Sequence, residues 1–111
     1  SAMNLNKFYI KDPALIERIR IDPTIVNNLI ASKKFFLGFL SRNDQWQRHH
    51  NHNQLRITRV IKSLLLLVSR DEAESFRRDV MSLIHVNSHI PTKAYEHWDL
   101  ALGNKPASQA S

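Results

Sequence analysis

The sequence has no cysteine and only two glycines. Without cysteine the chain forms no disulfide, no thiolate zinc site and no cysteine nucleophile, although this absence leaves the cellular compartment open. The longest uninterrupted apolar run covers residues 64–68, far short of the roughly 20 residues that a membrane-spanning helix needs. The opening stretch SAMNLNKFYIKD also lacks the apolar segment of a signal peptide. We therefore expect a soluble protein of the cytoplasm or nucleus, with export left open.

The sequence signatures of common active sites are missing as well. Ser63 and Ser69 lie in no turn of the nucleophile-elbow type, and there is no glycine-rich phosphate loop. No close pair of carboxylates stands apart from ordinary helix-surface positions. We therefore predict a non-enzymatic protein that needs no cofactor.

Acidic residues are scarce in the middle of the chain. Residues 33–62 contain one acid, Asp44, against seven cations, so their local excess of six equals the net charge of the whole protein, +6. These cations are Lys33, Lys34, Arg42, Arg48, Arg56, Arg59 and Lys62. Such a basic segment fits an acidic partner, whether a protein surface, nucleic acid or an anionic membrane. The alternative is a solvated helix face beside a basic loop, which needs no partner.

The chain of 111 residues is long enough for one domain with its own hydrophobic core. Ser1 and Ala2 precede Met3 and are interpreted as a cloning scar. Residues 104–111 are small and polar and are expected to be a disordered tail. Residues 3–103 then form a single helical domain. Because apolar residues recur at helical spacing almost throughout, the predicted fold class is all-α, a compact bundle of about five helices.

Two Asp-Pro pairs, at residues 12–13 and 22–23, mark the first two helices. In each pair the aspartate can cap free amides of the first turn, while proline takes the first helical position, where its missing N–H costs nothing. The predicted helices cover residues 13–20 and about 23–40. Residues 41–51, SRNDQWQRHHN, have no apolar period and are predicted to form a loop.

The best-defined element is a helix over about residues 52–68, which we expect to lie buried at the centre of the bundle. Asn51 followed by Gln54 resembles a capping box, in which the asparagine accepts from a free amide and the glutamine reaches back. The apolar residues form the stripe of a core-facing helix: Ile57, Val60, Ile61, Leu64, Leu65 and Val68. The cations of this segment lie largely off the stripe.

The last two helices follow from similar signals. Ser69 and Glu72 repeat the capping-box pattern and predict a helix that starts near Arg70 and ends before Pro91. A final helix is predicted to start at residue 90 or 92 and to run through residue 102. Gly103 is then a suitable C-terminal cap.

Two groups of histidines raise the question of a metal site. His49, His50 and His52 are close in sequence, and His85 and His89 have the i, i+4 spacing that zinc metalloproteases use on a helix. The residue after the first histidine of the second group is valine, where that motif has its catalytic glutamate. We predict no metal site and expect these histidines to cap, to pack against loops or to lie at the surface.

Nucleic-acid binding is the alternative function. The predicted helices on either side of Ser69, with a tight turn between them, resemble a helix-turn-helix. Six cations could meet phosphates: Arg56, Arg59, Lys62, Arg70, Arg77 and Arg78. Four acids interrupt the second of these helices and would face the phosphates unfavourably: Asp71, Glu72, Glu74 and Asp79.

Residues 51–67, NHNQLRITRVIKSLLLL, resemble the signature of the opioid growth factor receptor conserved region. In that family a histidine-asparagine pair precedes a leucine-arginine-isoleucine-threonine-arginine run and an apolar helix. Looser similarity covers residues 32–40, Trp46 and residues 94–102, whereas the family's early histidine-rich segment has no counterpart here. The resemblance implies a helical interaction module rather than a particular peptide receptor. It makes five matched positions candidates for a functional surface: His52, Asn53, Arg56, Thr58 and Arg59.

The favoured function is binding of an acidic or amphipathic protein or peptide partner through a basic rim. This rim is predicted to comprise His49, His52, Asn53, Arg56, Thr58, Arg59 and Lys62, with its arginines pairing with acidic groups. Tyr95 and Trp98 are expected to belong mainly to the core. If they are left uncovered, five aromatic residues are candidates to border a groove between helices: Phe35, Phe39, Trp46, Tyr95 and Trp98. The oligomeric state stays open.

Overall fold

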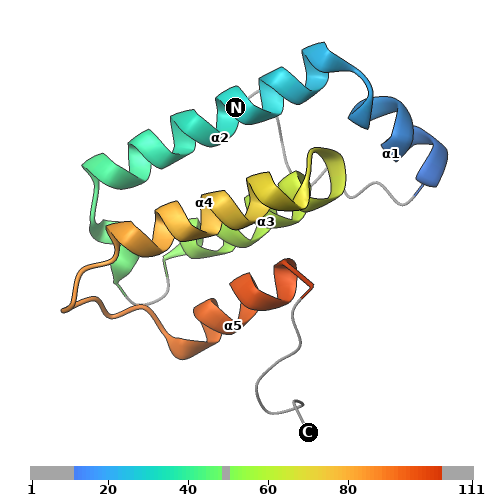
Figure 1. Ribbon diagram of the computed structural model, residues 1–111. Coiled ribbons are helices and arrows are strands. Elements are labelled where there is room, and N and C mark those ends of the chain that lie inside the picture. The colour runs from blue at the N-terminus through green and yellow to red at the C-terminus, as the bar shows by residue number, and fades with distance from the viewer. Residues whose placement is uncertain (1–11, 49–50, 104–111) are drawn as a thin grey trace, which may run out of the picture.

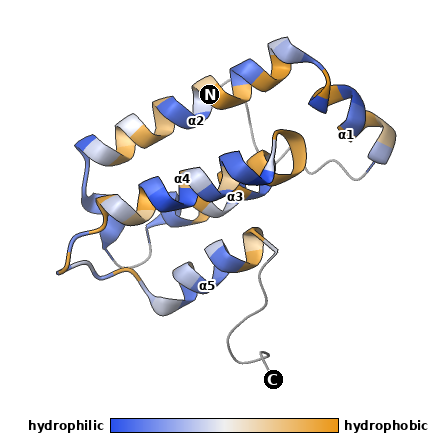
Figure 2. Cartoon of the chain, in the orientation of Figure 1, coloured by the Kyte–Doolittle hydropathy of each residue, from blue (hydrophilic) through white to orange (hydrophobic). Residues whose placement is uncertain are grey.

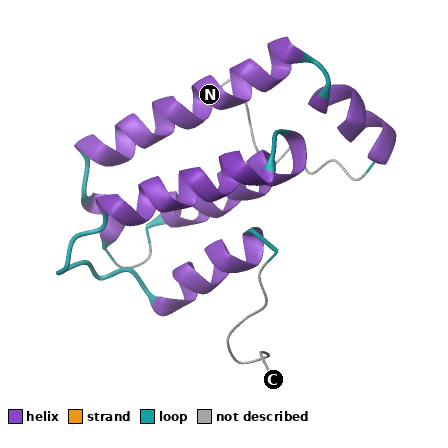
Figure 3. Ribbon diagram, in the orientation of Figure 1, coloured by secondary structure: helices purple, strands orange, loops and turns teal. Residues whose placement is uncertain are grey.

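The computed structural model describes residues 12–48 and 51–103, and this part of the chain contains five α-helices, one short 3-10 helix and no strand (Figure 1; Figure 3). The elements are α1 (Pro13–Arg20), α2 (Pro23–Arg42), η2 (Gln45–Gln47), α3 (His52–Leu67), α4 (Arg70–Leu83) and α5 (Thr92–Ala101). The all-α fold class is confirmed. None of these helices is both long and apolar enough to cross a membrane. The interpreted cloning scar and tail lie outside the described residues.

The two Asp-Pro pairs start α1 and α2 as predicted. Asp12 accepts a hydrogen bond from the amide of Ala14 at 3.0 Å, and Asp22 accepts from Thr24 at 3.0 Å and from Ile25 at 3.3 Å. Each aspartate has an extended backbone, and proline occupies the first turn in both helices. Local capping therefore sets both helix starts.

The helix α3 lies at the centre of the bundle, as predicted. It packs most extensively against α4 and α5, while α2 lies mainly on α4 and meets α3 only lightly (Figure 1). The side chains of Ile57 and Ile61 have no exposure, and Leu64 and Leu67 are also buried. Figure 2 shows how the C-terminal turns of α3 are predominantly hydrophobic. At that end Leu67 joins a small second cluster with Ile19 of α1 and Leu29 of α2.

The connection between α3 and α4 is a tight turn. The amides of Val68 and Ser69 both donate to the carbonyl of Leu64 at 2.9 Å, which closes the last turn of α3. The Ser69 hydroxyl then accepts from the amide of Glu72 at 3.1 Å and caps α4 as predicted. The chain reverses direction, so α3 and α4 form an antiparallel hairpin whose helices lie side by side (Figure 1).

The capping box predicted at Asn51 forms only in part. Asn51 caps α3 by accepting from the amide of Asn53 at 2.9 Å. The prediction for Gln54 was wrong, because its buried amide donates at 2.8 Å to the carbonyls of Trp46 and Arg48. Those carbonyls belong to the η2 segment and need a donor inside the protein. Gln54 therefore fixes the preceding loop to α3 rather than capping the helix.

The prediction that His85 and His89 share a helix face was also wrong. The helix α4 ends at Leu83, and both histidines lie in the connection to α5. The buried side chain of Gln47 donates to the carbonyl of Leu83 at 2.9 Å and accepts from the amide of His85 at 2.8 Å. The Gln47 carbonyl accepts from the amide of His89 at 2.8 Å. These bonds satisfy backbone groups that a continued helix would have paired internally.

Candidate functional site

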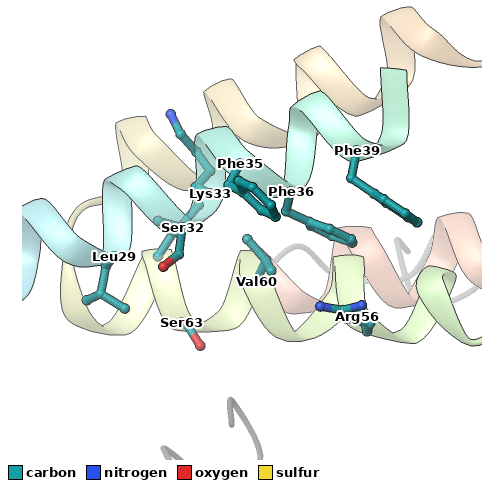
Figure 4. A pocket seen from close by; sticks show the side chains of 10 residues that line it. Leu29, Ser32, Lys33, Phe35, Phe36, Phe39, Arg56, Val60 and Ser63 are labelled. Carbon is teal, nitrogen blue, oxygen red and sulfur yellow. The ribbon is translucent and has the colours of Figure 1, made fainter. Parts of the chain in front are cut away.

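An apolar groove lies between α2 and α3, where the two helices are in only light contact. It encloses a cavity of about 240 Å³. Its lining comprises Leu29, Ser32, Lys33, Phe35, Phe36 and Phe39 of α2 together with Arg56, Val60, Ser63 and Leu64 of α3. Figure 4 shows Phe35, Phe36 and Phe39 extending from α2 toward the side of α3 that carries Val60 and Arg56. We call this feature the α2–α3 groove.

The three phenylalanines of the groove differ in exposure. Phe36 is only 7% exposed, and its ring stacks on Phe39 at a centroid distance of 6.4 Å and on Phe76 of α4 at 6.3 Å. Phe39 is half-buried. Phe35 is 76% exposed, although it lines the same groove. The groove therefore has a fixed aromatic floor and one aromatic side chain left largely in water.

Arg56 covers part of this floor. Its guanidinium carbon lies 5.0 Å from the centroid of the Phe36 ring, within the range of a cation–π contact. Its Nη1 reaches Asn53 Oδ1 only at the long distance of 3.5 Å. Because Arg56 is exposed and has no carboxylate partner among the described residues, its charge faces solvent at the edge of an apolar surface.

Lys33 lines the groove but directs its charge elsewhere. Its ammonium donates to Glu72 Oε2 of α4 at 2.9 Å, and its side chain is 9% exposed. Since the pair is partly buried, it ties α2 to α4 rather than offering a free charge. The lysine chain contributes mainly its methylenes to the groove wall.

The helices that form the groove carry charge of one sign. Neither α2 nor α3 contains an aspartate or glutamate, whereas each contains three lysines or arginines. Arg59 and Lys62 are exposed on α3, and no ion pair within the described ranges involves them. By contrast α4 and α5 together contain six acids, two of which pair with Arg70 and Arg77. The basic segment predicted from sequence thus falls largely on the two helices that form the groove.

The residues of the predicted basic rim differ in exposure and in whether they line the groove. His52, Arg56, Arg59 and Lys62 are exposed along α3, but only Arg56 lines the groove. Asn53 and Thr58 are half-buried. The Thr58 hydroxyl donates to the carbonyl of Gln54 at 3.3 Å, a local backbone bond. His49 lies outside the described residues.

The predicted groove aromatics separate into two groups. Phe35 and Phe39 line the α2–α3 groove. Trp46 and Trp98 do not border the groove, because they are 1% and 0% exposed, and their indole N–H groups donate to the carbonyls of Leu40 at 3.0 Å and Gln54 at 3.1 Å. The groove assignment of Trp46 was therefore wrong, whereas Trp98 has the core position that was expected first. Tyr95 lies edge-on against Trp98 at 5.3 Å and packs against the core, so it does not line the groove either.

The histidines of the described region are not arranged as a metal centre. Within residues 12–48 and 51–103, no three histidines, aspartates or glutamates are grouped so that they could hold an ion. His85 and His89 border an open polar hollow together with Asp44, Gln47 and Arg48. The spacing of the two histidines in sequence therefore does not translate into a shared helix face.

Sequence reasoning missed three polar residues that lie buried in the fold. Gln47 and Gln54 are buried amides, and Lys33 is a buried cation. No local pattern distinguishes a structural glutamine from a surface one. For Lys33 a weak signal existed, since it lies four residues after Leu29 and three before Phe36 on the buried face of α2.

Comparisons with models of known families, with curated proteins and with solved structures found no match to this chain. The resemblance of residues 51–67 to the opioid growth factor receptor conserved region therefore stays a prediction.

Proposed function

We propose that this protein is a non-enzymatic interaction module that binds another protein or a peptide through the α2–α3 groove and its basic rim. The observation that carries this proposal is Phe35, a large aromatic side chain left 76% exposed beside an apolar cavity. Exposed aromatics next to apolar surface are typical of binding sites, because burial on association removes their contact with water.

The surroundings of Phe35 support its role in a preformed binding site, because the groove beside it is held in place by packing and by an ion pair. The groove floor is held by stacking of Phe36 on Phe76, and one wall is fixed by the pair between Lys33 and Glu72. A site held in place by packing loses little conformational freedom on binding. The exposed cations of α3 then favour partners with acidic groups, which arginine can bind through two parallel hydrogen bonds.

Nucleic-acid binding remains the alternative proposal, supported by the cations and the absence of acids in α2 and α3. Two features weigh against it. The antiparallel α3–α4 hairpin differs from a helix-turn-helix, whose helices cross at a large angle. In addition, α4 exposes Asp71 and Asp79, which would repel phosphates.

Affinity capture from lysate on the immobilised protein tests the proposal and separates the two alternatives. Capture is carried out at about 50 and 200 mM salt, with and without nuclease, because phosphate-driven binding falls steeply with salt. The double variant Arg56→Ala/Arg59→Ala is compared with Arg78→Ala/Lys93→Ala, which removes two exposed cations from α4 and α5.

We expect one defined protein to be retained after nuclease treatment and at the higher salt. Its recovery should fall at least about tenfold on Arg56→Ala/Arg59→Ala and should not fall on Arg78→Ala/Lys93→Ala. Equal recovery on both double variants would contradict binding at the basic rim. Recovery of nucleic acid alone, lost at the higher salt, would favour the alternative function.

A further inference from the structure

We infer that the occupant of the α2–α3 groove is an acidic amphipathic α-helix of another protein. This inference rests on the proposed function and specifies the chemistry of the partner. Such a helix would lay its apolar face along Phe35, Phe36, Phe39 and Val60, with carboxylates on its flank meeting Arg56 and Arg59.

The dimensions of the groove fit a short helix. Its lining runs along α2 from Leu29 to Phe39, which at about 1.5 Å per residue corresponds to roughly 15 Å. Apolar anchors at positions i, i+3 or i+4, and i+7 of a partner helix span about 10 Å, so the groove accommodates three of them. The small side chains of Ser32 and Ser63 lie on opposite walls and leave room for the partner's backbone to approach.

The charges at the groove favour an acidic partner. Arg56 interacts with Phe36 through its cationic face and retains hydrogen-bond donors in its plane. A carboxylate beside this guanidinium can therefore form a charge-assisted bond without displacing the stacked arginine. Arg59 lies one helical turn further along α3 and is exposed, so acids spaced three or four residues apart on a partner helix would face both arginines.

Other candidate occupants match the charge and the apolar lining of the α2–α3 groove less well. Residues 1–11 of this chain carry two lysines and no acid, so they do not match a basic groove. A nucleic acid duplex offers phosphates but keeps the faces of its bases stacked on one another, so it presents no apolar face to Phe35 and Phe39. A second copy of the chain could present the acids of α4, and this possibility is an outcome of the test below.

An unbiased peptide selection tests the inference. Random peptides of about 16 residues, enough for roughly four helical turns, are displayed and selected on the full chain, with counter-selection on Phe35→Asp. Two matched variants then probe the site. Ser32→Glu adds a negative charge to the groove lining, while Asn27→Glu adds the same charge at an exposed position of α2 outside the lining.

We expect enriched peptides to be net negative, to repeat apolar residues at helical spacing and to become helical on binding, as seen by circular dichroism. Ser32→Glu should weaken the affinity of these peptides at least about tenfold. Asn27→Glu should leave their affinity within about twofold, because exposed charges outside the contact area are screened by salt. Leu55→Ala, which removes another exposed apolar side chain of α3, should have no effect.

Three results would overturn the inference: no enrichment, enriched peptides that are basic or alternate apolar residues at strand spacing, or equal binding to Ser32→Glu and Asn27→Glu. A concentration-dependent doubling of mass that Ser32→Glu abolishes would replace the partner helix by a second copy. If lysate capture identifies a partner that depends on Arg56 and Arg59 but that selected peptides do not displace, the proposed function stands and only the helical occupant is wrong.

Discussion

The side of α3 that faces α4 and α5 is closely packed, whereas the side that faces α2 is partly open. Toward α4 and α5, Ile57 and Ile61 have no exposure, and the Trp98 indole donates to the carbonyl of Gln54. Toward α2, the contact opens into a groove beside which Phe35 is 76% exposed. The same helix therefore serves as the centre of a closed core and as one wall of an open site.

Charge follows the same division. Arg77 of α4 pairs with Asp99 of α5 at 2.6 Å, so the closed side contains its own counter-charges. On the open side, α2 and α3 contain no acid, and the only described ion pair of these helices is that of Lys33 with Glu72. Apolar surface and unpaired positive charge thus coincide, which is the combination expected where an external partner supplies both apolar groups and acids.

The largest expected contrast uses two phenylalanines that differ in burial, Phe76 at 0% and Phe35 at 76% exposure. Phe76→Ala removes a fully buried ring and should lower the free energy of unfolding by about 3–5 kcal/mol. Phe35→Ala should change it by no more than about 0.5 kcal/mol, because that ring is mostly in water already. Urea denaturation followed by circular dichroism measures both variants. Similar losses for the two would show that the α2–α3 side is packed and not open.

A second comparison concerns two glutamines near η2. Gln54→Ala leaves the carbonyls of Trp46 and Arg48 without their buried donor and should cost about 1–3 kcal/mol of unfolding free energy. The matched change Gln45→Ala alters an exposed side chain and should be close to neutral. Thermal unfolding distinguishes them. A neutral Gln54→Ala would mean that water replaces the amide and that η2 is not fixed to α3.

The smallest expected effects have opposite signs at the two glycines. Gly103 follows α5 with φ +82°, so Gly103→Ala should destabilise the protein by about 1 kcal/mol through backbone strain alone. Gly38 lies inside α2, and a Cβ there would meet only the flexible end of Arg42 at 3.1 Å. Gly38→Ala should therefore stabilise the protein by up to about 1 kcal/mol through helix propensity. A destabilising Gly38→Ala would indicate that Arg42 is held in place.

Local signals in the sequence were sufficient for most of the fold. The Asp-Pro pairs, Ser69 and Gly103 set helix ends through bonds to nearby backbone, and the stripe of α3 identified the central helix. The end of α4 was not predicted, because it depends on Gln47, which is distant in sequence. The side chain of Gln47 forms hydrogen bonds with the Leu83 carbonyl and the His85 amide. Long-range bonds of this kind have no local pattern.

The candidate site was predicted less well than the fold. The local excess of cations predicted a basic segment, which the structure distributes over α2 and α3, since charge density is a property of the sequence itself. Which aromatics would border the groove depended on helix packing, and Trp46 and Trp98 proved to be core residues whose indole N–H groups are satisfied inside the protein. Phe35 could not be ranked above Phe36 until the position of α2 on α4 was known.

Backbone amide shifts in two-dimensional NMR, measured on the labelled protein with and without the partner recovered by capture, test the central claim most directly. If the α2–α3 groove is the binding site, the largest shifts will fall within residues 29–39 and 56–64, and Phe35→Ala will reduce them. Shifts concentrated in residues 70–102, with the amides of α2 unchanged, would contradict the assignment of binding to the open side.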